Sequence, residues 1–191
     1  LLEAMNDFQV SMDGHTHELP RPFMVLATQN PMEYHGTYPL PESQLDRFLM
    51  RLTIGYPGLE DEKKVIESQR DTHPINELQP VVSDATILAL QNEVKRVRVN
   101  ESLVDYMLSM VKATRESEEL LVGVSPRGIL SLYRAAQAKA LIEGRDYCIP
   151  DDIKELSTPV LSHRIMTRDS GSEERAVQIM EEIRNKVPVP D

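Results

Sequence analysis

The sequence predicts an α/β segment followed by an all-helical domain, with a mostly α composition overall. Two apolar runs, 23–28 and 49–56, are typical of strands that are covered on both faces, as in a parallel sheet. From Leu59 onward the apolar residues recur only at helical spacing. The texture changes at Pro57-Gly58, so we expect residues 1–57 to be the end of an α/β domain and residues 58–191 to be a helical domain.

The first elements are short. Leu1, Leu2 and Met5 lie at helical spacing, which predicts the end of a helix. The stretch QVSMDGHTHEL alternates around Asp13-Gly14, a strong two-residue turn signal, and predicts a β-hairpin over residues 9–19.

The remaining elements are predicted as helices. Residues 59–69 form a charged amphipathic pattern, and 72–80 carry two prolines, as a linker would. A helix should run from its cap, Ser83, to about residue 97. Further helices are expected over 103–114, from Pro126 to just before Gly144, from Pro150, and over 172–186. In the 103–114 helix, one face should consist of Leu103, Tyr106, Met107, Met110, Val111 and Thr114.

Composition limits the function. The 191 residues contain 40% hydrophobic residues and no apolar run of the roughly 18 residues that a membrane-spanning helix needs, so we expect a soluble, cytoplasmic protein. A single cysteine, Cys148, excludes an internal disulfide framework. The formal net charge of −10 argues against a broad DNA-binding surface, so any anion site must be local.

Asn30 is the first candidate site residue. It emerges from the predicted 23–28 strand, and ligands of open α/β sheets lie beyond the carboxyl ends of the strands. A neutral amide there can contact a phosphate oxygen and orient an attacking water. The alternative is that Asn30-Pro31 simply initiates a turn.

Arg47 is the second candidate. Residues 1–57 hold only three basic side chains, so an arginine there invites a reason. Pro41-Glu42-Ser43 looks like a helix start, which would place Arg47 on a short helix near the same sheet edge, where it could stabilise charge on a neighbouring subunit's γ-phosphate. The alternative is a surface ion pair with Asp46 or Glu42.

Arg127, in GVSPRG, is the third candidate. With Ser125 as cap, Arg127 falls in the first turn of a helix, where the macrodipole favours an anion and disfavours a cation. A bound phosphate would resolve that conflict. The alternative is a salt bridge to Glu118 or Glu119.

Other patterns are weaker. His15 and His17 alternate on the hairpin without a third ligand at a telling spacing, so no metal site is predicted. His163-Arg164 is interpreted chiefly as a packing element at a helix end. The sequence has no G-x-x-x-x-G-K-[ST] motif and no apolar run ending in paired acids, so these residues alone should not carry out ATP chemistry.

The ordered set ATQNP, GTYPLPESQLDRF and SPRG closely resembles the MoxR family of AAA+ ATPases. The resemblance implies that the chain is the C-terminal part of such a protein: the end of a P-loop AAA+ core plus its helical lid, with Walker A and Walker B upstream of Leu1. It also implies that Asn30 is sensor 1, Arg47 the arginine finger and Arg127 sensor 2. The implied cofactor is ATP with Mg²⁺ in the full-length protein, with no tight binding by this part.

The resemblance further implies a ring, expected as a hexamer, that remodels or matures partner proteins, among them von Willebrand factor A proteins. Whether Arg127 acts on its own or a neighbour's nucleotide stays open. One alternative is a non-catalytic helical interaction module. A weaker one is a DNA-handling relative with the same hairpin, which the acidic balance opposes.

Overall fold

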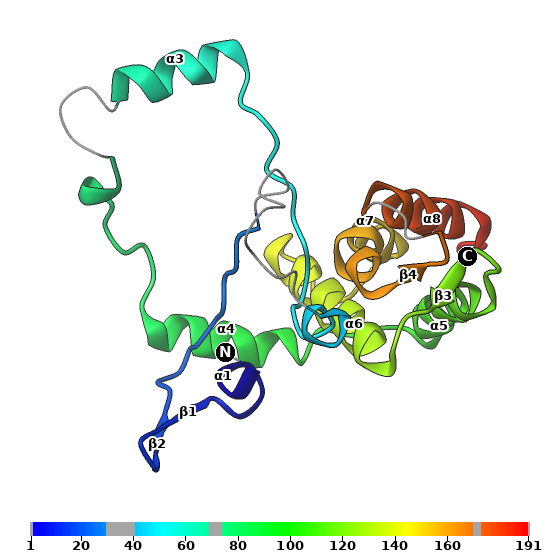
Figure 1. The fold of residues 1–191 in the computed structure, drawn as a ribbon, viewed down its shortest axis with the longest axis horizontal. Coiled ribbons are helices and arrows are strands. Elements are labelled where there is room, and N and C mark those ends of the chain that lie inside the picture. Colours follow the sequence, from blue (N-terminus) through cyan, green and yellow to red (C-terminus); the bar gives the residue numbers. More distant parts are fainter. Residues whose placement is uncertain (1, 30–40, 69–73, 170–172, 191) are drawn as a thin grey trace.

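The computed structural model describes residues 2–29, 41–68, 74–169 and 173–190. Two small two-stranded sheets accompany a majority of helices, which confirms the predicted mostly α class (Figure 1). The helices that pack together, α5 to α8, occupy one side of the molecule, and α3 lies on the other (Figure 1).

The N-terminal elements are α1 (Leu2–Asp7) and the hairpin of β1 (Gln9–Met12) and β2 (His15–Glu18). The two strands pair antiparallel, with Gln9 opposite Glu18 and Met12 opposite His15. Asp13 and Gly14 both have positive φ, 52° and 78°, the backbone that a type I′ turn requires. The predicted hairpin is therefore confirmed.

The predicted strands at 23–28 and 49–56 are not formed. Neither segment belongs to a sheet, and several of their apolar side chains face solvent: Leu26 is 83% exposed and Ile54 is 98% exposed. A strand is defined by hydrogen bonds to a neighbour, and no described strand lies beside either segment. The composition of both runs is typical of buried strands, but the described residues contain no strand that pairs with either run.

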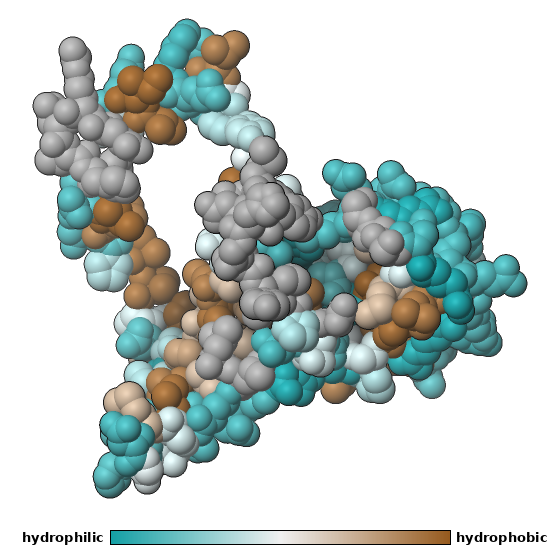
Figure 2. Space-filling view, viewed as in Figure 1, coloured by the Kyte–Doolittle hydropathy of each residue, from teal (hydrophilic) through white to brown (hydrophobic). Residues whose placement is uncertain are grey.

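The linking region contains α3 (Leu59–Ser68), the 3₁₀ helix η1 (Pro74–Glu77) and α4 (Asp84–Val94). Ser83 caps α4 as predicted, because its hydroxyl accepts the Thr86 N–H at 3.2 Å. Helix α3 buries none of its residues. Figure 2 shows hydrophobic residues gathered on this side of the molecule, whereas the bundle presents a mostly hydrophilic face.

The core lies among α5 (Glu101–Glu116), α6 (Pro126–Ile142), α7 (Pro150–Leu161) and α8 (Glu173–Lys186), with strands β3 (Leu120–Val122) and β4 (Met166–Thr167) beside them. The 3₁₀ helix η2 (Ser162–Arg164) continues α7. The six α5 residues predicted to share one face are the six that α5 buries. Burial of this apolar stripe between the helices stabilises the bundle.

The predicted division at residue 57 stays a prediction. Residues before it pack on the helical bundle: Met50 lies against the core cluster, and the Arg51 N–H donates to the Pro159 carbonyl at 2.8 Å. Arg51 also pairs with Glu173 at the start of α8. The segment 41–51 is therefore held by the helices, and this contact builds the site described next.

Candidate functional site

Arg127 lies in the first turn of α6, as predicted. The hydroxyl of Ser125 accepts the Gly128 N–H at 3.3 Å, and Pro126 occupies the first helical position. Arg127 is exposed, and no described residue hydrogen-bonds or pairs with its guanidinium. The alternative salt bridge to Glu119 is not formed, since Glu119 pairs with Arg175.

Arg47 does not lie on the short helix that the sequence predicted. Helix α2 (Glu42–Leu45) ends two residues earlier, and Arg47 follows in a turn where its N–H donates to the Gln44 carbonyl at 3.2 Å. The Arg47 Nη1 is buried and has no hydrogen-bond partner among the residues that the structure describes, and the Asp46 carboxylate binds other groups.

Arg47 and Arg127 line the same cavity, of about 290 Å³. Residues from the end of α1, the turn after α2 and the first turns of α6 form its wall: Met5, Asn6, Arg47, Leu49, Arg127 and Ser131. Two arginines without a described acidic partner thus line one volume, although they are 80 positions apart in the chain. A buried guanidinium donor without a partner is costly, and an anion would satisfy it.

Asn30, the third predicted site residue, lies outside the described residues. Gln29, the residue before it, is exposed. The structure therefore brings two of the three predicted side chains together and leaves the position of the third as a prediction.

Arg164 is the residue whose importance sequence reasoning underestimated. Its side chain is 1% exposed and forms an ion pair with Asp46 at 2.9 Å. Its Nε donates to the Val160 carbonyl at 2.8 Å, and its Nη1 donates to the Asp46 carbonyl at 2.7 Å. The signal in the sequence was the pair His163-Arg164 at a helix end, but the ion-pair partner of Arg164, Asp46, is 118 positions away.

Burial and charge shift two pKa values beside the cavity. Burial lowers the pKa of the Arg164 guanidinium, and the charge of Arg127 adds to that effect while Asp46 opposes it. The pKa of His163 is lowered to about 4, first by burial and then by the positive charge of Arg164. His163 is therefore neutral near pH 7, with Nε2 placed 3.2 Å from the Phe48 carbonyl.

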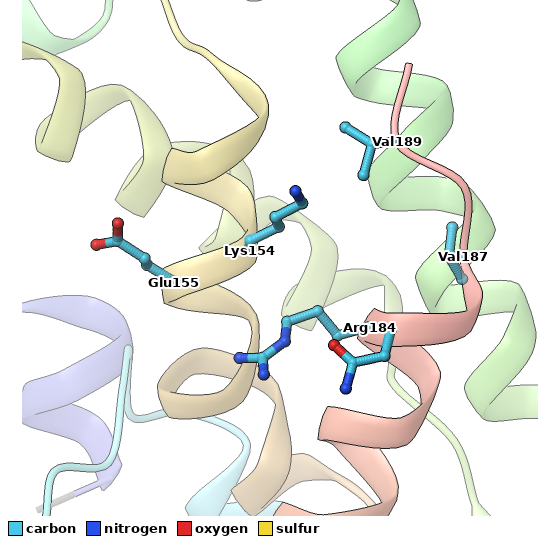
Figure 3. A pocket seen from close by; sticks show the side chains of 6 residues that line it. Lys154, Glu155, Arg184, Val187 and Val189 are labelled. Atoms are coloured by element: carbon cyan, nitrogen blue, oxygen red, sulfur yellow. The ribbon is translucent and has the colours of Figure 1, made fainter. Parts of the chain in front are cut away.

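A second cavity, of about 350 Å³, lies between α7 and α8 (Figure 3). Its wall consists of Lys154, Glu155, Arg184, Asn185, Val187 and Val189. The Glu155 carboxylate is bound by Lys139 at 2.7 Å. No predicted site residue lines this cavity, and it shares no residue with the first one.

Two further expectations concern metals and membranes. Within the described ranges, no three His, Cys, Asp or Glu side chains gather in a way that could hold a metal ion. No described helix is both long enough and apolar enough to cross a bilayer.

Comparisons with known proteins match both ends of the chain. Residues 1–50 match the family model described as "ATPase family associated with various cellular activities (AAA)", and residues 112–183 match the AAA lid domain. The chain is 48% identical over 192 residues to the uncharacterised protein YeaC of Bacillus subtilis, covering 100% of this chain and 60% of YeaC. It is 40% identical over 190 residues to chaperone MoxR1 of Mycobacterium tuberculosis, covering 94% of this chain and 50% of MoxR1.

A solved structure agrees with these matches. The crystal structure of a proposed ATPase from Cytophaga hutchinsonii superimposes with a TM-score of 0.88 and 38% sequence identity, covering 100% of this chain and 61% of that one. The chain thus spans about half to three-fifths of the length of these proteins.

Proposed function

We infer the function from this premise: the chain belongs to the MoxR family of AAA+ ATPases. We propose that the protein takes part in ATP hydrolysis and that its cavity residues Arg47 and Arg127 act on the phosphate end of the nucleotide during the reaction. The hydrolysis would drive chaperone-like remodelling of partner proteins. One observation supports the proposal most strongly: Arg47 has a buried Nη1 without a described hydrogen-bond partner, and it lines the same cavity as Arg127.

The residues of the cavity fit a polyphosphate. Guanidinium groups donate in a planar fork that matches phosphate oxygens. Arg127 lies at the N-terminus of α6, where the positive end of the helix macrodipole also favours an anion. Bound ATP would supply the γ-phosphoryl group that water attacks. Arg47 and Arg127 would stabilise the negative charge that develops on its oxygens, the largest contribution that such residues make in phosphoryl transfer.

The shared cavity also suggests which nucleotide Arg127 serves. In the resemblance, Arg47 is the finger offered to a neighbouring subunit within a ring. Because Arg127 lines the same cavity, we propose that both arginines act on that neighbour's nucleotide. Asn30, as sensor 1, would act on the nucleotide of its own subunit. The 1–57 and 58–191 segments would then be the end of the AAA+ core and the lid, in a cytoplasmic hexameric ring.

The Mg²⁺ ion is not assigned to residues of this chain. The described residues offer no carboxylate cluster for it, so we propose only that it accompanies ATP. Von Willebrand factor A proteins are proposed clients on the family resemblance alone.

Single substitutions in the full-length protein test this proposal. Arg47→Ala should lower the turnover of ATP by about 10³- to 10⁵-fold, the range known for arginine fingers, with nucleotide affinity nearly unchanged. Arg127→Ala should weaken ATP binding or hydrolysis. Arg96→Ala is the matched control, since it removes a cation from an exposed ion pair with Glu93 outside the cavity. Wild-type turnover in both Arg47→Ala and Arg127→Ala would refute the proposal and favour a non-catalytic interaction module.

A further inference from the structure

We propose that Arg164 is a positioning residue that fixes Arg47 relative to Arg127, with Asp46 as its counter-ion. The inference rests on the proposed function of the two cavity arginines. Arg164 is not among the residues that line the cavity, so it acts through others and is not itself a catalytic residue.

Arg164 holds the backbone on both sides of Arg47 by hydrogen bonds. Its guanidinium donates to the carbonyls of Asp46 on one side of Arg47 and of Phe48 and Leu49 on the other, at 2.7, 2.5 and 3.3 Å. A turn without regular secondary structure is otherwise free to shift. These bonds set where the Arg47 Cα stands and therefore where its side chain enters the cavity.

Arg164 connects this turn to the helix that carries Arg127. The Arg164 Nη2 also lies 3.1 Å from the Ser131 hydroxyl, one helical turn beyond Arg127 on α6. Ser125, the cap of α6, donates its hydroxyl to both carboxylate oxygens of Asp46 at 3.1 Å. The Arg164–Asp46 pair thus touches both the Arg47 turn and the first turns of α6.

Close packing completes the connection. Gly128 lies directly beside the Arg164 stem: a Cβ built at this position would stand 3.2 Å from the Arg164 Cδ. The absence of a side chain at Gly128 lets the buried stem pass against the start of α6. The Arg164 side chain is therefore enclosed by the elements that it joins, while the Asp46 side chain stays 27% exposed, so water screens the pair only in part.

The chemistry explains why this residue is an arginine. Arginine offers five N–H donors in a fixed plane, and Arg164 directs its three nitrogens to acceptors on three segments of the structure: α7, the turn after α2, and α6. Lysine keeps the charge but offers a single nitrogen with three donors. Arg164→Lys should therefore keep the ion pair with Asp46 and lose the simultaneous grip on the turn and on α6.

The experiment is a double-mutant cycle on ATP turnover in the full-length protein. Arg164→Lys should lower turnover by about 10- to 100-fold, because a misplacement of about 1 Å can cost about 10²-fold, while the Kd for ATP changes little. In the Arg47→Ala background the same change should lower turnover less than threefold, because the group that Arg164 positions is gone. A general structural role would instead lower turnover by the same factor in both backgrounds.

A milder variant covers the case in which Arg164→Lys does not fold. Ser131→Ala removes one hydrogen bond of the α6 connection and should lower turnover in the same direction, again with little effect in the Arg47→Ala background. Arg98→Ala, which loses an exposed ion pair with Asp146, serves as the control and should leave turnover unchanged.

The outcomes separate the two proposals. Wild-type turnover in both Arg47→Ala and Arg127→Ala removes the proposed function itself, and wild-type turnover in Arg47→Ala alone overturns the positioning role. A collapse of turnover in Arg47→Ala together with wild-type turnover in both Arg164→Lys and Ser131→Ala leaves the proposed function standing and overturns the positioning role. Equal loss in both backgrounds also overturns it.

Discussion

The tight packing of Gly128 against Val124 makes a prediction whose sign depends on the background. A Cβ at Gly128 would stand 2.5 Å from the Val124 Cγ1, whereas ordinary contact begins at 3.4 Å. Val124 is 1% exposed, so its side chain has little room to move. Gly128→Ala should therefore carry an overpacking cost of about 1–3 kcal/mol, reduced by the gain of up to about 1 kcal/mol that alanine brings in a helix.

The expected result is a net destabilisation of about 1–2 kcal/mol by Gly128→Ala in the wild-type background. In the Val124→Ala background the clashing methyl is absent, so Gly128→Ala should be neutral or stabilise by up to about 1 kcal/mol. The residual contact with the Arg164 Cδ at 3.2 Å limits the gain. The predicted coupling between the two sites is thus about 2 kcal/mol.

Urea unfolding followed by circular dichroism at 222 nm measures these four free energies of unfolding, provided that the m-values agree. Gly58→Ala is the control, since a Cβ there meets nothing within 4 Å and should change stability by less than about 0.5 kcal/mol. An equal cost of Gly128→Ala in both backgrounds would show that Val124 is not the neighbour that restricts this position.

Three further predictions concern the helical bundle. Leu132→Ala should cost about 2–5 kcal/mol of unfolding free energy, because Leu132 is fully buried in the core, whereas Leu130→Ala, at a position 67% exposed, should cost less than about 0.5 kcal/mol by the same urea titration. The fold lowers the pKa of His163 to about 4 and so prefers the neutral ring; this contribution to stability is complete above about pH 6.5 and is lost as the pH falls toward 4. Wild-type stability should therefore fall more steeply over that range than the stability of His163→Gln. Parallel curves of stability against pH would contradict the assignment. Burial raises the pKa of the Cys148 thiol to about 11, so a thiol-reactive disulfide reagent at pH 8 should modify Cys148 only after unfolding, and rapid modification of the folded protein would show that the thiol is accessible.

The helices could be predicted from the sequence because their signals are local. The spacing of Leu103, Tyr106 and Met110 is contained within three turns of α5, and Ser125-Pro126 fixes the start of α6 within four residues. The Asp13-Gly14 turn is equally local. Each of these elements formed where its own residues placed it.

The apolar runs at 23–28 and 49–56 illustrate what local signals leave out. Their composition is typical of strands in a covered sheet. A strand forms only beside another strand, however, and an apolar run does not specify which segment will pair with it. Likewise, α2 ends at Leu45, before Arg47, and the turn that follows carries Arg47 to the cavity.

The site was partly predictable for a similar reason. Arg47 and Arg127 each stood out locally, one by its scarcity and the other by its conflict with a helix dipole. Arg164 did not, because it binds carbonyls and a carboxylate that are 115 to 118 positions away in the chain. The spacing of apolar residues along a helix or strand cannot indicate a contact between residues so far apart in the chain.

Arg47 and Arg127 are proposed to serve one phosphate-binding cavity, and this shared role is the central claim to test. ATP turnover of full-length wild type, Arg47→Ala, Arg127→Ala and the double variant measures it directly. If both side chains stabilise the same phosphoryl group, the loss in the double variant should stay well below the product of the two single losses, because the first removal already disables the unit. Losses that multiply in full would show that the two arginines act at separate places and would contradict the account.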